Sequence, residues 1–203
     1  MNINAVVRSV QAALGVSVDG NPGPETWRAI HEKIVGKAVP KSAAFAGRAD
    51  ERSEKTIVTL HPQVAPYARM LVERAAAANI EIKILSGTRS YAEQDALFAI
   101  GRTKEKNRRP VTNAKGGESN HNFGIAFDVG VFRGKEYLGD SPLYATVGAI
   151  GMDIGLEWGG QWESFVDMPH YQLRPDWSEG MSEREMLREL RARKAAGKDA
   201  YAT

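Results

Sequence analysis

Three residues that can bind a metal ion lie in two short segments of the second half of the chain. His121 and Asp128 are seven positions apart, and His170 follows in a segment that also contains Asp167. The chain has no cysteine, so His, Asp and Glu are the strong metal ligands that it offers. Two imidazoles and one carboxylate suit Zn²⁺ and leave a fourth position for water, as hydrolytic zinc sites require. If the spacing of His121 and Asp128 is taken alone, the alternative to a metal site is a hydrogen-bonded pair of these two side chains.

Asp167 is an acid beside the last of these histidines that the ligand set does not need. A carboxylate next to a metal site, but outside its coordination shell, can take a proton from water. Glu157 is the rival for this role, and it is the weaker candidate because it precedes Trp158 and is not beside a ligand.

These side chains need a sheet to position them. Large apolar residues alternate with small ones around Phe127, which predicts a strand over residues 124–132 with Asp128 on its small-residue face. A carboxylate buried there needs a partner, and a cation is the obvious one. Further strands are predicted over residues 81–85, 156–158 and 170–173, and helices over residues 62–79, 91–100, 143–154 and from 182 onward. The mixture predicts an α+β fold with a small antiparallel sheet and flanking helices.

The rest of the sequence predicts how the chain is divided into domains. Residues 1–36 predict a small helical module, because apolar residues at helical spacing stand on both sides of the Gly- and Pro-rich turn at 19–24. Residues 37–56 have the composition of a linker. We therefore expect a main domain over residues 57–180 and a C-terminal helix and tail over residues 181–203, where Ser182 and Glu185 form a capping-box pattern.

Composition excludes several classes of protein. Charged residues make up 26% of the chain, hydrophobic residues make up 42%, and the formal net charge is +2. We expect no membrane insertion, no signal peptide, no nucleic-acid partner and a monomer. Residues 101–115 carry six Lys and Arg against one Glu, whereas residues 117–180 carry ten acids against three bases. This basic loop beside an acidic segment is either a contact for an anionic polymer or a solvated surface loop.

A family resemblance covers about residues 57–175. The pattern Ser119-x-His121-x-x-Gly124-x-Ala126-x-Asp128, followed by Asp167-x-x-His170, resembles the zinc D-Ala-D-Ala carboxypeptidase and L-alanyl-D-glutamate endopeptidase family of cell-wall peptidases. The segment 86–90 with Gln94, and the segment Trp158-Gly159-Gly160, belong to the same resemblance. It implies the fold shared by D,D-peptidases and the Hedgehog signalling domain.

The resemblance also implies roles for residues. His121, Asp128 and His170 are the implied zinc ligands, Asp167 is the implied general base, and Arg89 is the group that steadies the substrate carbonyl as it becomes an oxyanion. Arg89 has a structural alternative, as the partner of an acid.

Two further positions carry implied roles at the substrate. Ser119 and Gln94 are the implied substrate-binding residues. For Ser119 the alternative is a role as the cap of its loop.

The implied activity is hydrolysis of a stem-peptide amide bond of peptidoglycan by a lysin made in the cytoplasm and acting on the cell wall. Asp167 before the last histidine, together with the Trp and Gly segment, favours the phage-type L-alanyl-D-glutamate endopeptidase over the D-alanyl-D-alanine carboxypeptidase. A non-catalytic wall-binding module is disfavoured because all three ligands are intact. Residues 10–26, with the core Asp19-Gly20-x-x-Gly23-Pro24-x-Thr26, resemble a peptidoglycan-binding helical module, and a plain helical hairpin is the alternative there.

Overall fold

The computed structural model describes residues 2–18, 20, 26, 29–30, 33–34, 49–163 and 165–202. It divides the chain into two compact units, residues 1–43 and 44–203. None of the described helices is long and apolar enough to cross a lipid bilayer.

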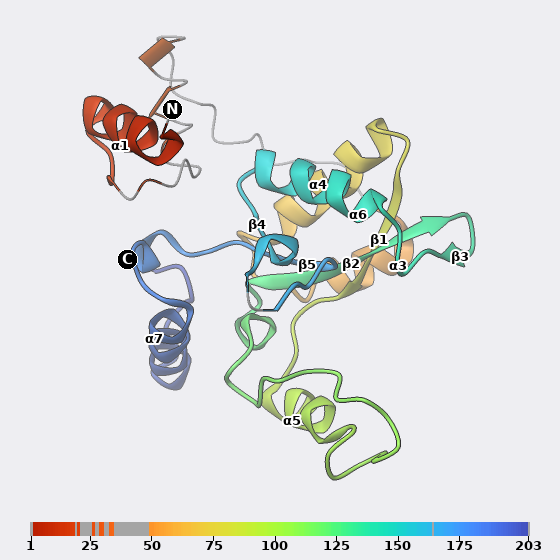
Figure 1. The fold of residues 1–203 in the computed structure, drawn as a ribbon. Helices are drawn as coiled ribbons and strands as arrows, with labels where there is room; N and C mark the ends of the chain where they lie inside the picture. The colour runs from red at the N-terminus through yellow and green to blue at the C-terminus, as the bar shows by residue number, and fades with distance from the viewer. Residues whose placement is uncertain are drawn as a thin grey trace. The chain divides into compact units, whose positions relative to one another are not determined.

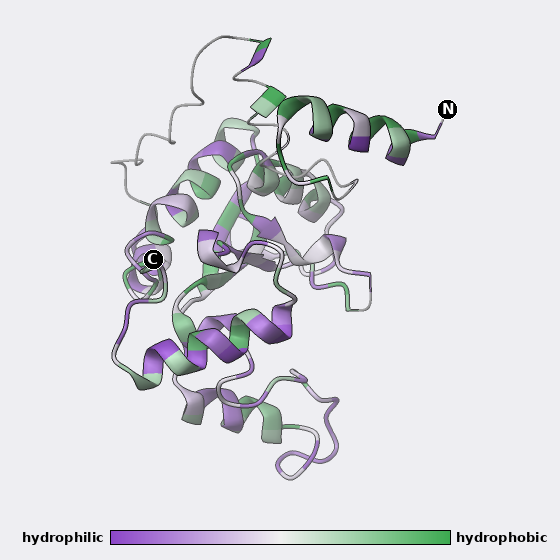
Figure 2. Cartoon of the chain, turned by 90° about the vertical axis from the view of Figure 1, so that its left-hand side faces the viewer, coloured by the Kyte–Doolittle hydropathy of each residue, from purple (hydrophilic) through white to green (hydrophobic). Residues whose placement is uncertain are grey.

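The first unit contains helix α1 (Ile3–Leu14), which Asn2 caps by accepting from the N–H of Ala5. Gln11 is 1% exposed and ties the helix to the following turn. Its amide donates to Oγ1 of Thr26 (3.0 Å), and its carbonyl accepts from the N–H of Gly20 (2.8 Å). Apolar residues run along α1, seen as green beside the N label in Figure 2, and Ile3 stays exposed. Residues 26, 29–30 and 33–34 are helical; the rest of the expected second helix lies outside the described residues.

The second unit is built on one antiparallel sheet (Figure 1). Its strands follow the order β1-β2-β5-β4, and β3 pairs with the far end of β2. Their bounds are β1 Glu81–Ser86, β2 Ala126–Arg133, β3 Glu136–Tyr137, β4 Glu157–Trp158 and β5 His170–Gln172. The predicted α+β class with a small antiparallel sheet is therefore confirmed.

The α-helices of this unit lie around the sheet, with α4 and α6 above it in the view of Figure 1. Their bounds are α3 Glu51–Ile57, α4 Ala65–Ala77, α5 Tyr91–Ala99, α6 Leu143–Asp153 and α7 Glu183–Ala195. Short 3-10 turns are η1 Asn120–Phe123, η2 Gly159–Gln161 and η3 Asp176–Ser178. Alternate residues of β2, namely Phe127, Val129 and Val131, are fully buried in the main core, as their alternation predicts.

Three elements differ from the sequence expectations. Helix α3 begins inside the stretch expected as a linker and ends at Ile57, the first residue of the expected main domain. Ile57 is fully buried in the main core, and the Ser53 hydroxyl accepts from the N–H of Ile84 on β1 (2.9 Å). Strand β2 begins at Ala126, because Gly124 turns the chain with φ +71°. The two-residue strand β3 is too short to give a pattern.

Helix α7 starts where its capping box predicts, at Ser182. Met186, Leu187 and Leu190 of α7 form a second hydrophobic cluster with Phe123 and Ile125. The C-terminal helix thus packs on the segment that carries the first predicted ligand.

Candidate metal centre

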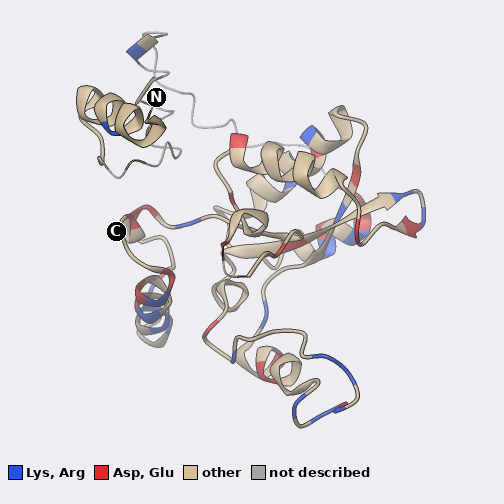
Figure 3. Cartoon of the chain, viewed as in Figure 1, with Lys and Arg blue, Asp and Glu red and all other residues tan. Residues whose placement is uncertain are grey.

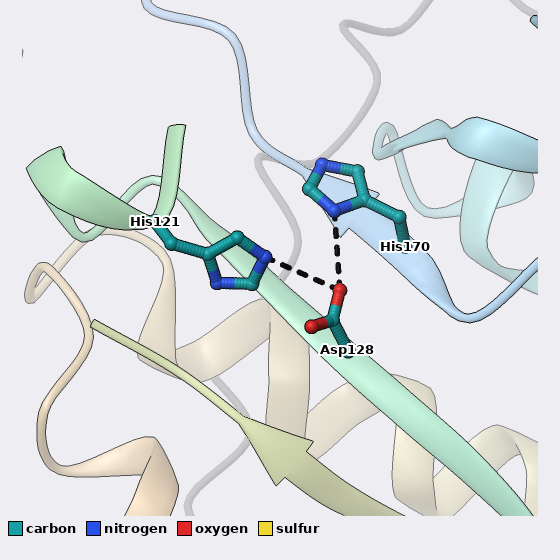
Figure 4. Close-up of side chains that lie close together, drawn as sticks. All are labelled: His121, Asp128 and His170. Atoms are coloured by element: carbon teal, nitrogen blue, oxygen red, sulfur yellow. Dashed lines mark hydrogen bonds and ion pairs between the residues drawn. The ribbon is translucent and has the colours of Figure 1, made fainter. Parts of the chain in front are cut away.

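The three predicted ligands come together from three elements (Figure 4). His121 lies on η1, Asp128 on β2 and His170 on β5. The sheet register pairs Asp128 directly with His170, so their side chains share one face of the sheet. Gly124 turns the chain between η1 and β2, which brings His121 back to the same place.

The donor atoms of these residues converge on one point. Nε2 of His121 lies 3.2 Å from Oδ1 of Asp128, and Nδ1 of His170 lies 3.1 Å from the same oxygen. One donor atom from each of the three residues lies within 4.8 Å of the others. Both imidazoles are buried, His121 at 2% and His170 at 6% exposure.

The other ring nitrogens show which atoms carry protons. Nδ1 of His121 lies 2.8 Å from the carbonyl oxygen of Gly87, and Nε2 of His170 lies 3.1 Å from the carbonyl oxygen of the Gln172 side chain. Carbonyl oxygens only accept, so these nitrogens donate. In the neutral rings, the nitrogens that face Asp128 then carry lone pairs. Two lone pairs and a carboxylate aimed at one point repel each other unless a cation binds there, so the donor set fits Zn²⁺.

The pKa shifts of the ligand side chains agree with this arrangement. Burial favours the neutral form of Asp128, but His121 and His170 hold its pKa well below the usual range, so it remains a carboxylate. Burial lowers the pKa of His170, but the hydrogen bond and charge of Asp128 outweigh it and raise that pKa. A proton therefore competes with a metal ion for Nδ1 of His170.

Arg89 lies at the edge of this centre, three residues after the end of β1. Its guanidinium NH2 lies 3.7 Å from Oδ2 of Asp128, and its side chain is 20% exposed. Nε of Arg89 is buried and has no hydrogen-bond partner among the described residues. Burial lowers the pKa of Arg89, against the charges of Asp128 and Asp167. Arg89 thus both pairs with an acid and keeps donor capacity at the centre.

Asp167 is held beside the ligands by the Trp158-Gly159-Gly160 segment. Its N–H donates to the carbonyl of Gly159 (2.9 Å), and its own carbonyl accepts from the N–H of His170 (3.1 Å). A Cβ on Gly159 would lie 2.6 Å from the Asp167 carbonyl oxygen, so this approach requires glycine. Burial, followed by the charge of Asp128, raises the pKa of Asp167, which makes it a better proton acceptor than an ordinary Asp.

The two residues predicted to bind substrate, Gln94 and Ser119, differ in their surroundings. Gln94 is 0% exposed, and its amide donates to Thr112 Oγ1 (3.3 Å) and to the Ala114 carbonyl (2.9 Å). The side chain of Gln94 is therefore inside the fold, where it holds the 101–115 loop, and its contact with substrate stays a prediction. Ser119 is half-buried before η1 and makes no capping hydrogen bond with its side chain, which removes the capping alternative.

Of the other two histidines, the structure describes His61. His61 lies 2.8 Å from Asp199 and 4.6 Å from the ring of Tyr201, in keeping with a structural role. His31 is outside the described residues.

The 101–115 loop shows its basic charge in Figure 3, where it follows α5. Arg102 donates to the carbonyl of Phe98 on α5 (2.8 Å) and to the carbonyl of Thr112 within the loop (2.9 Å). Arg108 pairs with Glu105 at 2.8 Å. Contact with an anionic polymer stays a prediction.

Sequence reasoning missed the residues behind His170. Gln172 accepts from His170 and donates to Oε2 of Glu157 at 2.6 Å. Asn120 donates to Gln172 and to Glu183, both at 2.5 Å. The alternation His170-x-Gln172 on a strand is the signal that would have placed Gln172 on the same face. Glu157, the rival base, is engaged by Gln172.

Known proteins match this chain in sequence, and the matched family model covers the part that contains His121 and Asp128. The family model described as VanY, D-alanyl-D-alanine carboxypeptidase, matches residues 57–158. The peptidoglycan L-alanyl-D-glutamate endopeptidase CwlK of Bacillus subtilis is 39% identical over 127 residues, which are 58% of this chain and 75% of CwlK.

Two solved structures also resemble the chain. The L-Ala D-Glu endopeptidase ChiX of Serratia marcescens has a TM-score of 0.47 at 24% identity, covering 65% of this chain and 93% of ChiX. The second structure is a variant of the vancomycin-resistance D,D-pentapeptidase VanY from a VanB-type cassette, in complex with Zn(II). Its TM-score is 0.47 at 16% identity, and the match covers 70% of this chain and 81% of that VanY chain. On the sequence matches, the chain belongs to the VanY D-alanyl-D-alanine carboxypeptidase family.

Proposed function

We propose that the protein is a zinc-dependent peptidoglycan peptidase that cleaves the L-alanyl-D-glutamate bond of the stem peptide. The observation that carries the proposal is the convergence of two imidazole lone pairs and one carboxylate, from His121, His170 and Asp128, on one point. The name of its 39% identical relative, an L-alanyl-D-glutamate endopeptidase, supports this choice of bond.

Three ligands would hold the metal ion, and two further residues would act on the substrate. Bound Zn²⁺ supplies Lewis acidity for amide hydrolysis. Asp167 accepts a proton from the attacking water and returns it to the departing amine, a task for which its raised pKa suits it. Arg89 donates to the carbonyl oxygen of the scissile bond as negative charge develops on it. Ser119, half-exposed before η1, would bind the substrate nearby.

The second candidate is removal of the terminal D-alanine. It is favoured by the description of the matching family model, D-alanyl-D-alanine carboxypeptidase. Both reactions hydrolyse an amide and require the same centre, so the geometry of the ligands does not discriminate between them.

Mass spectrometry of digested peptidoglycan discriminates between the two candidates. The endopeptidase releases stem fragments that begin with a free amine on D-Glu and leaves glycan strands on which each cleaved stem is shortened to L-Ala. The carboxypeptidase releases free D-Ala and leaves the stem attached. Release of D-Ala without new D-Glu amino termini would overturn the endopeptidase assignment and retain the peptidase.

Residues 1–36 are proposed to form a wall-binding module, joined by a linker to a monomeric peptidase that acts on the cell wall. The support is the motif around Gly20 and Thr26 and the tie that Gln11 makes to both residues. Helix α3 belongs by its packing to the peptidase, so the linker would end before Glu51.

A further inference from the structure

We propose that Gln172 is a positioning residue that fixes which nitrogen of His170 faces the metal, and that Glu157 and Glu183 hold the amides that do this. The inference rests on the proposed role of His170 as a zinc ligand, but it does not depend on which peptide bond is cleaved.

The sheet register builds the arrangement. On β5, His170 and Gln172 are two positions apart and therefore point to the same face. Across the sheet, His170 pairs with Asp128 of β2, and Gln172 pairs with Glu157 of β4. The ligand pair thus lies in the ladder between β2 and β5, and the supporting pair lies two residues along β5 in the ladder between β5 and β4. Gln172 is 1% exposed, so water does not compete for its hydrogen bonds.

Two carboxylates decide how the amides are oriented. A carboxylate only accepts hydrogen bonds, so Glu157, 2.6 Å away, requires the NH₂ group of Gln172 on its side. The carbonyl oxygen of Gln172 must then face Nε2 of His170, at 3.1 Å. Nε2 therefore carries the proton, and Nδ1 presents its lone pair toward Asp128 at 3.1 Å.

Asn120 of η1 adds a second constraint, which connects Gln172 to the C-terminal helix. Its NH₂ group donates to the same oxygen of Gln172 and to Oε1 of Glu183, the first residue of α7, both at 2.5 Å. This orientation leaves Oδ1 of Asn120 buried, with no hydrogen-bond partner among the described residues. Arg174 lies 3.4 Å from Glu183 and 3.8 Å from Glu157, so one cation holds both carboxylates.

The consequence is that the neutral ring of His170 has one favoured tautomer, the one whose Nδ1 can bind the metal ion. Removal of such a supporting hydrogen bond typically weakens metal affinity about 10- to 100-fold. The same hydrogen bonds explain why Glu157 lies near the centre without acting as its base, because its carboxylate accepts a hydrogen bond from Gln172.

The test measures zinc affinity by chelator competition on the full chain. Gln172→Leu, which keeps the size but neither donates nor accepts, should bind Zn²⁺ about 10- to 100-fold more weakly than the parent protein. Gln94→Leu is the matched control, since Gln94 is equally buried but touches no ligand. It should lose stability and keep the parent affinity.

A charge swap keeps the proposal testable even if Gln172→Leu does not fold. Gln172→Glu places two carboxylates against each other and should weaken zinc binding. Gln172→Glu combined with Glu157→Gln restores a donor opposite an acceptor and should recover at least the parent affinity. In zinc-loaded protein labelled with ¹⁵N-histidine, NMR should show His170 protonated at Nε2 and His121 protonated at Nδ1.

Three results would overturn the proposal. Gln172→Leu could bind zinc within twofold of the parent, the swap could fail to recover affinity lost by Gln172→Glu, or His170 could carry its proton on Nδ1. With any of these results, the proposed function would still stand if the parent protein binds zinc and cleaves peptidoglycan. A parent protein that takes up no zinc would instead overturn both.

Discussion

Asp167 is the side chain on which the proposed proton transfer depends. It lies beside the ligand His170 but is not part of the ligand set, and burial raises its pKa. Asp167→Asn should therefore keep one zinc ion per chain and lose about 10²- to 10⁴-fold in kcat on a soluble stem peptide. Zinc content and kcat are measured on the same preparation.

Glu157→Gln provides the comparison, because Glu157 is the other acid near the centre. The carbonyl oxygen of the new amide can still accept from Gln172, so this variant should stay active once it is loaded with zinc. An inactive, zinc-replete Glu157→Gln beside an active Asp167→Asn would transfer the role of base to Glu157.

Arg89 is expected to act through the shape of its guanidinium group. Lysine keeps the charge but offers a single ammonium in place of a planar fork of donors. Arg89→Lys should lower kcat on the order of 10²-fold, with zinc content unchanged. A near-normal kcat in the lysine variant would show that Arg89 serves only as the partner of Asp128.

Single residues differ in how far sequence could predict them. His121, Asp128 and His170 were predictable, because a chain without cysteine has few ligands and their spacing matches a family pattern. Gln94 was not, since its neighbours Thr112 and Ala114 are set by the path of a loop. The role of Gln172 depends on which strands are paired, and one sequence does not give the register.

At the scale of elements, the turn between η1 and β2 determines whether His121 faces Asp128. Gly124 has φ +71°, and an added Cβ would lie 3.0 Å from the backbone nitrogen of His61. Gly124→Ala should therefore cost roughly 1–2 kcal/mol from the left-handed conformation alone, and should also weaken zinc binding. Urea unfolding and chelator competition measure the two effects.

Gly134 is the matched control for this glycine. It also has a positive φ (+62°), but nothing lies within 4 Å of its added Cβ, and it is in the β2–β3 turn. Gly134→Ala should lose stability through backbone strain and retain its zinc affinity. Equal losses of zinc affinity in both variants would mean that the η1–β2 turn does not position His121.

Elements with a strong local pattern were predictable, and those that depend on distant contacts were not. Helix α7 has a capping box, and β2 has alternating apolar residues. Helix α3 has seven residues, mostly polar or charged, and is held by the buried contacts of Ser53, Glu54 and Ile57. Its sequence therefore resembles a linker although its packing belongs to the core.

At the scale of the whole molecule, the two units should have separable tasks. The ligands, Arg89 and Asp167 all belong to residues 44–203. A protein that starts at Lys37 should keep its zinc content and its kcat on soluble stem peptides, while its lysis of intact sacculi falls. Binding to the polymer through a second site raises the local concentration of substrate, and the truncation removes that gain.

A different result of the truncation would contradict separable tasks. If residues 1–36 are part of one core with the peptidase, truncation would lower thermal stability, and cleavage of soluble peptides and of sacculi would fall together.

Zinc stoichiometry, measured together with activity, most directly tests the metal centre formed by His121, Asp128 and His170. Elemental analysis of the purified chain should find one zinc ion per molecule. A chelator should remove both the zinc and the release of stem peptides from sacculi, and added Zn²⁺ should restore both. His170→Ala should bind zinc poorly and should stay inactive when Zn²⁺ is added. Full cleavage of sacculi by rigorously metal-free protein would contradict a zinc peptidase.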